Sequence, residues 1–105
     1  MGSFSNIYDI KRINDYDNYI VTKHGWKRFV ERGITLNMIH DAIESGEIIE
    51  YYDEDKPFPG CLILGCYNNT PIHIVLSLND DLLFIITAYY PDLKRWEDDY
   101  RTIKE

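Results

Sequence analysis

Positive charge is scarce in this sequence of 105 residues. Eleven Lys and Arg residues stand against 18 Asp and Glu residues, and the formal net charge is −7. A protein that holds nucleic acid through many phosphate groups is usually basic. The overall charge therefore argues against a broad surface for RNA or DNA and leaves room only for a local cationic site.

Long apolar runs are scarce as well. No stretch approaches the roughly 20 residues that a transmembrane helix needs, and residues 1–6 lack the basic start and apolar run of a signal peptide. We therefore expect a cytoplasmic protein that makes no membrane contact.

Cysteine is limited to Cys61 and Cys66, which lie in one apolar segment with strand character. Five residues of strand place them about 16 Å apart on opposite faces, which excludes a disulfide between them. We expect two buried thiols, because free cysteine is among the most buried residue types. No cluster of His, Cys, Asp or Glu has the spacing of metal ligands, so we expect neither a metal nor another cofactor.

Apolar residues, in contrast, are plentiful. They make up 45% of the chain, with 14% aromatic residues, which indicates one globular domain over residues 1–105. Isoleucines at helical spacing predict a helix over residues 5–17, within an N-terminal helical extension of residues 1–19. A second helix is predicted over residues 22–32, and a third begins after Thr35.

Four later segments rich in β-branched and aromatic residues predict strands. Short connections join them, so we expect an antiparallel meander. The fold class is therefore α+β, with N-terminal helices packed on a four-stranded antiparallel sheet. The tail after Pro91 is expected to form a short helix. The predicted strands are residues 47–52, 61–67, 71–78 and 82–90.

The second helix carries the most informative pattern. His24, Arg28 and Arg32 are spaced i, i+4 and i+8, so they stack along one helical face. An imidazole can move a proton and a guanidinium can hold a charged oxygen, which is what chemistry at a phosphate needs. The alternative is a solvated face in which both arginines pair with Glu31 or with Asp residues. The residues expected to bury on another face are Trp26, Phe29 and Val30.

A second polar group comes from the last hairpin. A three-residue turn at Asn79 to Asp81 would place His73 opposite Thr87 and diagonal to Tyr89. These side chains would supply the acid and base types that a catalytic site needs beside the cations of the helix. The alternative for His73 is a sheet histidine with one ring nitrogen bonded to a neighbour. The core pairs on the other face would be Ile74 with Ile86 and Leu76 with Phe84.

Several short motifs, taken in order, resemble the bacterial domain-of-unknown-function family DUF4258. The resemblance covers roughly residues 20–98, which we expect to form a family-like α+β core. The motifs are Thr22-Lys23-His24, Arg28, Glu31-Arg32-Gly33-Ile34-Thr35, Ala42-Ile43, Gly46-Glu47-Ile48-Ile49-Glu50, Leu62-Ile63-Leu64-Gly65, Pro71-Ile72-His73-Ile74-Val75 and Ile86-Thr87-Ala88-Tyr89-Tyr90-Pro91.

That family is similar to the barnase–EndoU–colicin–RelE class of small nuclease folds. The resemblance implies a metal-independent endoribonuclease of toxin–antitoxin type, with RNA as substrate and a zinc-finger or helix-turn-helix antitoxin as partner. The alternative, which the acidic balance favours, is a non-catalytic protein-interaction module that uses the same sheet face. The implied catalytic residues are His24, Arg28, His73, Thr87 and Tyr89, and Lys23, Lys27 and Arg32 are the further candidates for binding RNA.

Overall fold

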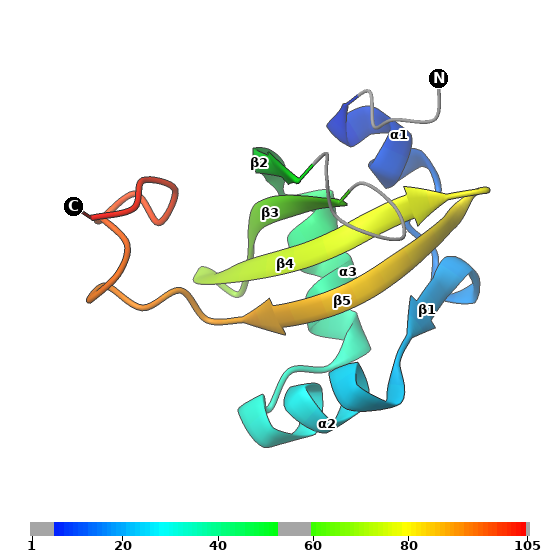
Figure 1. Ribbon diagram of the computed structural model, residues 1–105, viewed down its shortest axis with the longest axis horizontal. Coiled ribbons are helices and arrows are strands. Elements are labelled where there is room, and N and C mark those ends of the chain that lie inside the picture. The colour runs from blue at the N-terminus through cyan, green and yellow to red at the C-terminus, as the bar shows by residue number, and fades with distance from the viewer. Residues whose placement is uncertain (1–5, 53–59, 105) are drawn as a thin grey trace.

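The computed structural model describes residues 6–52 and 60–104 and has a five-stranded sheet in the order β1-β5-β4-β3-β2 (Figure 1). β1 runs parallel to β5, and all other neighbouring strands are antiparallel. The α+β class is confirmed, but the prediction of four antiparallel strands is wrong, because the sheet is mixed and has a fifth strand. The strands are β1 (Tyr19–Val21), β2 (Glu47–Tyr52), β3 (Gly60–Tyr67), β4 (Thr70–Asn79) and β5 (Leu82–Tyr89).

The missed strand, β1, is only three residues long and pairs with the first half of β5, from Leu83 to Ile85. Three residues are too few to show the alternation by which a strand is found in a sequence. Since β1 stops opposite Ile85, the second half of β5 has no strand on that side. α2 lies beside this part of the sheet edge (Figure 1).

Three α-helices and one 3-10 turn precede the last four strands. The predicted helix over residues 5–17 is too long, because the α-helix ends at Arg12 and Asp15 then caps a separate 3-10 turn. Asn and Asp side chains compete with helical hydrogen bonds in this way. Asn6 caps the first helix, and residue 5, where the predicted helix begins, lies outside the described residues. The elements are α1 (Ile7–Arg12), η1 (Tyr16–Asn18), α2 (Lys23–Arg32) and α3 (Leu36–Glu44).

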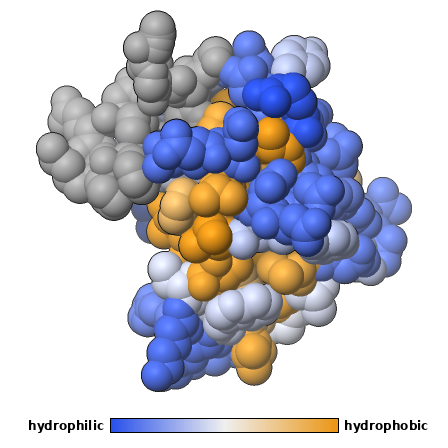
Figure 2. All heavy atoms as spheres, turned by 90° about the vertical axis from the view of Figure 1, so that its right-hand side faces the viewer, coloured by the Kyte–Doolittle hydropathy of each residue, from blue (hydrophilic) through white to orange (hydrophobic). Residues whose placement is uncertain are grey.

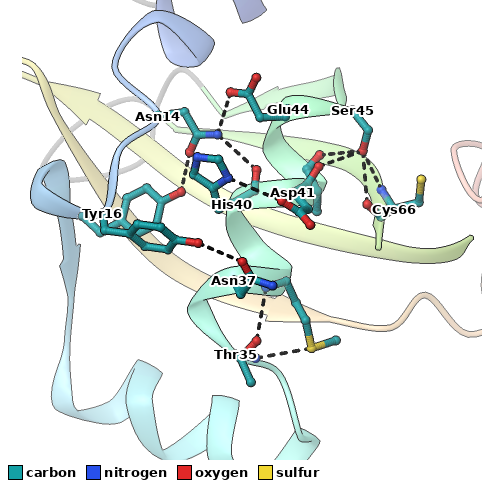
Figure 3. Close-up of polar contacts among 12 residues, drawn as sticks. Asn14, Tyr16, Thr35, Asn37, His40, Asp41, Glu44, Ser45 and Cys66 are labelled. Carbon is teal, nitrogen blue, oxygen red and sulfur yellow. Dashed lines mark hydrogen bonds and ion pairs between the residues drawn. The ribbon is translucent and has the colours of Figure 1, made fainter. Parts of the chain in front are cut away.

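Polar contacts tie the N-terminal extension to α3 (Figure 3). The amide nitrogen of Asn14 donates to the His40 carbonyl oxygen at 3.1 Å and to the Glu44 carboxylate at 2.8 Å. The Tyr16 ring stacks on His40 with centroids 5.0 Å apart, and its hydroxyl donates to Asn37 at 3.0 Å. This network fixes the chain just before it enters β1.

One face of the sheet packs against the helices and forms the core. α3 approaches β3 so closely that a Cβ on Gly65 would lie 1.8 Å from the carbonyl oxygen of Ala42. Only glycine fits there. In the part of the chain that the structure describes, no helix is long and apolar enough to cross a membrane. The largest fully buried apolar residues are Phe29, Ile10, Ile39, Ile43, Leu62, Ile63, Ile72, Ile74, Leu76, Leu83 and Ile85.

The register of the last hairpin differs from the prediction in two steps. The turn has two residues, Asp80 and Asp81, both with left-handed backbone (φ +52° and +61°), which suits a two-residue hairpin loop. A bulge in β5, where Ile86 is the extra residue opposite Val75 and Leu76, then shifts the pairing by a further residue. Each one-residue shift moves the side chains of β5 to the opposite face of the sheet relative to those of β4. Beyond the bulge both shifts have occurred, so the residues there share faces as predicted.

Before the bulge the predicted faces are therefore wrong. Leu76 pairs with Ile85, while Phe84 lies opposite Ser77 on the other face. Beyond the bulge Ile74 pairs with Ala88 rather than Ile86, and Ile86 is 46% exposed. His73 lies opposite Tyr89, and Thr87 opposite Val75, so the predicted His73–Thr87 pair is also wrong.

Two smaller predictions are also corrected. Both thiols are free, but only Cys61 is buried, and burial raises its pKa to about 12; Cys66 is exposed. Among the described residues after Pro91 there is no helix. Instead the segment from residue 92 to residue 104, the C-terminal segment, folds into turns closed by a β-bridge between Trp96 and Ile103.

Candidate functional site

The helix that carries the cationic residues begins and ends as its sequence predicts. The hydroxyl oxygen of Thr22 accepts a hydrogen bond from the Gly25 amide at 2.9 Å. Gly33 adopts the left-handed conformation (φ +68°) and ends the helix. The predicted helix is therefore confirmed, within a residue, as α2.

The buried face of α2 is narrower than predicted. Phe29 and Gly25 are buried, and a Cβ on Gly25 would lie 3.6 Å from the carbonyl oxygen of Ile86 in β5. Trp26 is 44% exposed and Val30 is 78% exposed, so the prediction that both are buried is wrong. The reason is that α2 lies along the edge of the sheet, where only one narrow stripe of the helix meets β5 (Figure 1).

Within residues 6–52 and 60–104, the cationic face of α2 has no acidic partners. Because α2 is one continuous helix, His24, Arg28 and Arg32 lie along one side of it. No ion pair involving the four Lys and Arg residues of α2 occurs within the described residues, although Glu31 is on the same helix. The alternative predicted arginines that pair with Glu31 or with aspartates, and the described part of the chain contains no such pair. The four cations are Lys23, Lys27, Arg28 and Arg32.

Arg32 joins this helix to the sheet. Its Nη1 donates to the Ala88 carbonyl oxygen at 2.8 Å and to the Thr87 hydroxyl at 3.2 Å. Both acceptors lie in the half of β5 that β1 leaves uncovered. The structure thus brings together Arg32 and Thr87, two of the candidate residues, from separate elements.

His73 is completely buried, with 0% exposed surface. Its Nε2 lies 2.6 Å from the carbonyl oxygen of Tyr100, which can only accept, so Nε2 carries the proton. Nδ1 then accepts from the Tyr89 hydroxyl at 3.3 Å. Burial lowers the pKa of His73, although the Tyr100 carbonyl and Glu50 oppose the shift. His73 is therefore a neutral histidine held by its neighbours.

This geometry separates the two candidate histidines. Both ring nitrogens of His73 are occupied by Tyr89 and Tyr100, and neither bonds to a residue of α2. His24 is exposed at the first turn of α2. The alternative for His73, a sheet histidine bonded to its neighbours, agrees with the structure.

The C-terminal segment supplies the cover over His73. Trp96 meets the imidazole edge to face with centroids 4.6 Å apart. Tyr100 has left-handed backbone (φ +60°), within a turn closed by hydrogen bonds from the Arg101 and Thr102 amides to the Asp99 carboxylate. Its carbonyl accepts the hydrogen bond from His73. Arg101 then reaches across to β2 and pairs with Glu47 at 3.0 Å.

A pocket of about 310 Å³ lies where β5 passes into this segment. Burial raises the pKa of the Tyr89 hydroxyl, and the positive charges of Arg95 and Arg32 act against that rise. Sequence reasoning missed Arg95, because no periodic pattern marks the turns in which it lies. The pocket is lined by Tyr89, Tyr90, Asp92, Arg95 and Trp96.

The chemistry available here is that of cations, one exposed imidazole and aromatic rings. Within the described residues, no three His, Cys, Asp or Glu side chains lie close enough to hold a metal ion. Arg28 and Arg32 can bind a phosphate, Thr87 can donate a hydrogen bond to it, and His24 can exchange a proton.

Comparison with curated proteins and with solved structures gave no match. A family model described as "Domain of unknown function (DUF4258)" matches residues 21–90, which covers two-thirds of the 105-residue chain. The match begins just before α2 and ends just after β5, so it includes all of the candidate residues and excludes both α1 and the C-terminal segment. This chain therefore belongs to the DUF4258 family.

Proposed function

We propose that this protein is a metal-independent endoribonuclease of the RelE/barnase-like toxin class, and that α2 holds the phosphodiester backbone of its RNA substrate. The supporting observation is the set of four cations on α2, none of which forms an ion pair within the described residues. Residues 20–33 contain four Lys or Arg residues and one Glu, which gives +3 in a protein of net charge −7. Isolated positive charge in an acidic protein draws an anionic ligand to that one place.

The reaction would begin at His24. Its neutral imidazole takes the proton of a ribose 2′-hydroxyl, and the 2′-oxygen attacks the adjacent phosphorus. Arg28 and Arg32 stabilise the negative charge of the phosphorane. The bond to the 5′-oxygen then breaks, water protonates the leaving oxygen, and the product is a 2′,3′-cyclic phosphate.

Three of the candidate catalytic residues, His73, Thr87 and Tyr89, receive different roles in this proposal. The hydroxyl proton of Tyr89 points to His73, so Tyr89 is a poor proton donor for the leaving group. His73 acts as a positioning residue that fixes Tyr89, and Thr87 positions the guanidinium of Arg32. Lys23 and Lys27 add electrostatic attraction along the RNA backbone.

Cleavage of a single-stranded oligoribonucleotide that carries a fluorophore and a quencher tests this proposal. Wild-type protein should cleave it in excess EDTA, and His24→Ala and Arg28→Gln should lower the rate by about 100-fold or more. Arg12→Gln, which removes one exposed arginine of α1, is the matched control and should cleave at the wild-type rate. Activity that disappears in EDTA and returns with magnesium, or a fully active His24→Ala protein, would contradict the proposal.

A second candidate function is a protein-interaction module. Ile20 of β1 is 40% exposed, alongside the exposed Trp26 and Val30 of α2. Figure 2 shows the side of the molecule on which β1 lies, where apolar side chains form a band between hydrophilic flanks. Exposed apolar groups of this kind favour a protein partner, such as an antitoxin, on α2 and β1. A protein that cleaves no RNA and binds such a partner through Trp26 would favour this second function.

A further inference from the structure

The pocket at the end of β5 combines three aromatic rings with one cation and one carboxylate. Its volume of about 310 Å³ is at the lower end of the range for small-ligand sites, roughly 300–1,000 Å³. Aromatic faces stack on flat rings, while a cation and a carboxylate can read hydrogen-bonding groups at a ring edge. The pocket therefore has the components needed to hold one nucleobase.

Contacts within the chain hold Trp96, one of the three aromatic rings, in place before any ligand arrives. Trp96 packs on the fully buried His73, and the backbone amide of Trp96 donates to the Asp92 carbonyl at 2.9 Å. The β-bridge from Trp96 to Ile103 holds the same residue from the other side. A rigid site loses little entropy when it binds a flat ring.

The polar groups of the pocket are not neutralised by one another. Asp92 and Arg95 are one turn apart, and the Arg95 amide donates to the Asp92 carbonyl at 2.9 Å. One carboxylate oxygen of Asp92 accepts from the Lys94 amide at 2.9 Å. In the described part of the chain neither the Asp92 carboxylate nor the Arg95 guanidinium forms an ion pair. An acceptor and a donor are thus both available at the pocket.

The pocket also adjoins the phosphate-binding face that we assign to α2. Arg32 bonds to Ala88, and the next residue, Tyr89, lines the pocket. A strand of RNA with one phosphate at Arg32 would therefore carry a neighbouring base toward Tyr89.

We infer that this pocket binds one base of the RNA strand and that it prefers guanine; this inference rests on the proposed function. Guanine presents two N–H donors beside the acceptor O6. The carboxylate of Asp92 accepts from those donors, and the guanidinium of Arg95 donates to O6. The other three bases present at most one donor group next to an acceptor, so they form fewer hydrogen bonds with the Asp92 carboxylate and the Arg95 guanidinium.

The test is a nuclear magnetic resonance titration of the whole chain with the four nucleosides, which carry no phosphate. The indole N–H signal of Trp96 reports on the pocket, and that of Trp26 on α2 is the internal reference. Guanosine should move the Trp96 signal alone and bind at least five-fold tighter than adenosine, cytidine or uridine. Asp92→Asn, in which the amide oxygen can still accept from the Lys94 amide, and Arg95→Gln should each weaken guanosine binding at least five-fold.

Lys94→Gln is the matched control, because Lys94 belongs to the same turn but does not line the pocket, and it should bind guanosine as the wild type does. Equal binding of all four nucleosides, no binding, or a Trp96 shift produced equally by inorganic phosphate would overturn the inference. The same titration on His24→Ala tests the pocket separately from cleavage, and this variant should bind guanosine as the wild type does. Guanosine binding without any RNA cleavage would therefore disprove the nuclease and leave the pocket in place.

Discussion

The two candidate histidines of this protein have opposite surroundings. His73 has no exposed surface, and both of its ring nitrogens are bonded within the chain. His24 is exposed, on a helix whose cations form no ion pair in the described residues. Both lie within the region that matches the DUF4258 family, so family membership alone does not tell them apart.

The C-terminal segment is what makes the surroundings of His73 different from those of His24. Trp96 and the Tyr100 carbonyl, which occupy the imidazole of His73, both lie beyond residue 90, where the family match ends. No described residue covers His24 in the same way, and it remains exposed. A histidine held on every side suits a fixed structural role, whereas an exposed imidazole beside unpaired arginines suits chemistry on a ligand.

The largest effect on stability is expected at the two tryptophans. Trp96 is 4% exposed and packs on His73, so Trp96→Ala should lower the free energy of unfolding by about 3–5 kcal/mol. Trp26 is 44% exposed, and Trp26→Ala should cost only about 1 kcal/mol. Urea unfolding followed by circular dichroism measures both. Equal losses would show that α2 is as deeply covered as the sheet face.

The next effect is a dependence of stability on pH that comes from His73. Its pKa is lowered in the folded protein, so the unfolded chain binds a proton more readily below about pH 6.5. This contribution to stability is complete above pH 6.5 and declines as the pH falls toward the pKa of the folded state. The slope should reach at most ~1.4 kcal/mol per pH unit.

Urea unfolding between pH 7.5 and pH 5 measures this slope, with His73→Phe as the comparison. The variant removes the titrating ring and should flatten the part of the profile just below pH 6.5. His24→Ala serves as the matched control and should leave the wild-type slope in place. An unchanged slope in His73→Phe would mean that other groups cause the pH dependence.

Much of the fold could be predicted from the sequence, because the signals are local. Thr22 and Gly33 mark the ends of α2, and residues 47–52 form β2 as their composition predicts. β1 could not be found, because its pairing with β5 joins residues more than 60 positions apart and its three residues carry no pattern. The bulge at Ile86 was equally hidden, since residues 82–86 are all apolar and show no alternation from which a one-residue shift could be detected.

The site could be predicted only in part, for a related reason. Helical spacing correctly grouped His24, Arg28 and Arg32 on one side of α2. Strand alternation placed His73 and Tyr89 on one face, although it gave the wrong partner across the hairpin. What covers a face depends on tertiary contacts, and the turns that carry Arg95 have no sequence period.

A smaller effect is expected at Arg32, which links α2 to β5. Arg32→Gln removes the charged donor to the Ala88 carbonyl and should lower the free energy of unfolding by about 1–2 kcal/mol. Arg28→Gln is the matched comparison, because in the described residues Arg28 makes no side-chain hydrogen bond, and it should cost less than ~0.5 kcal/mol. Similar losses in both variants would indicate that Arg32 contributes no more to the stability of the fold than Arg28 does.

The smallest effect on stability should accompany the largest effect on activity. His24→Ala replaces an exposed side chain, so the free energy of unfolding should change by less than ~0.5 kcal/mol, while RNA cleavage falls by about 100-fold or more. His73→Phe should show the reverse balance, with a clear loss of stability and a smaller loss of cleavage than His24→Ala, because it frees the Tyr89 hydroxyl but removes no group that acts on the RNA. Unfolding curves and cleavage rates measured on the same samples give both numbers. If His24→Ala unfolds as readily as His73→Phe, its loss of activity reflects folding, and the imidazole of His24 has no separate role in catalysis.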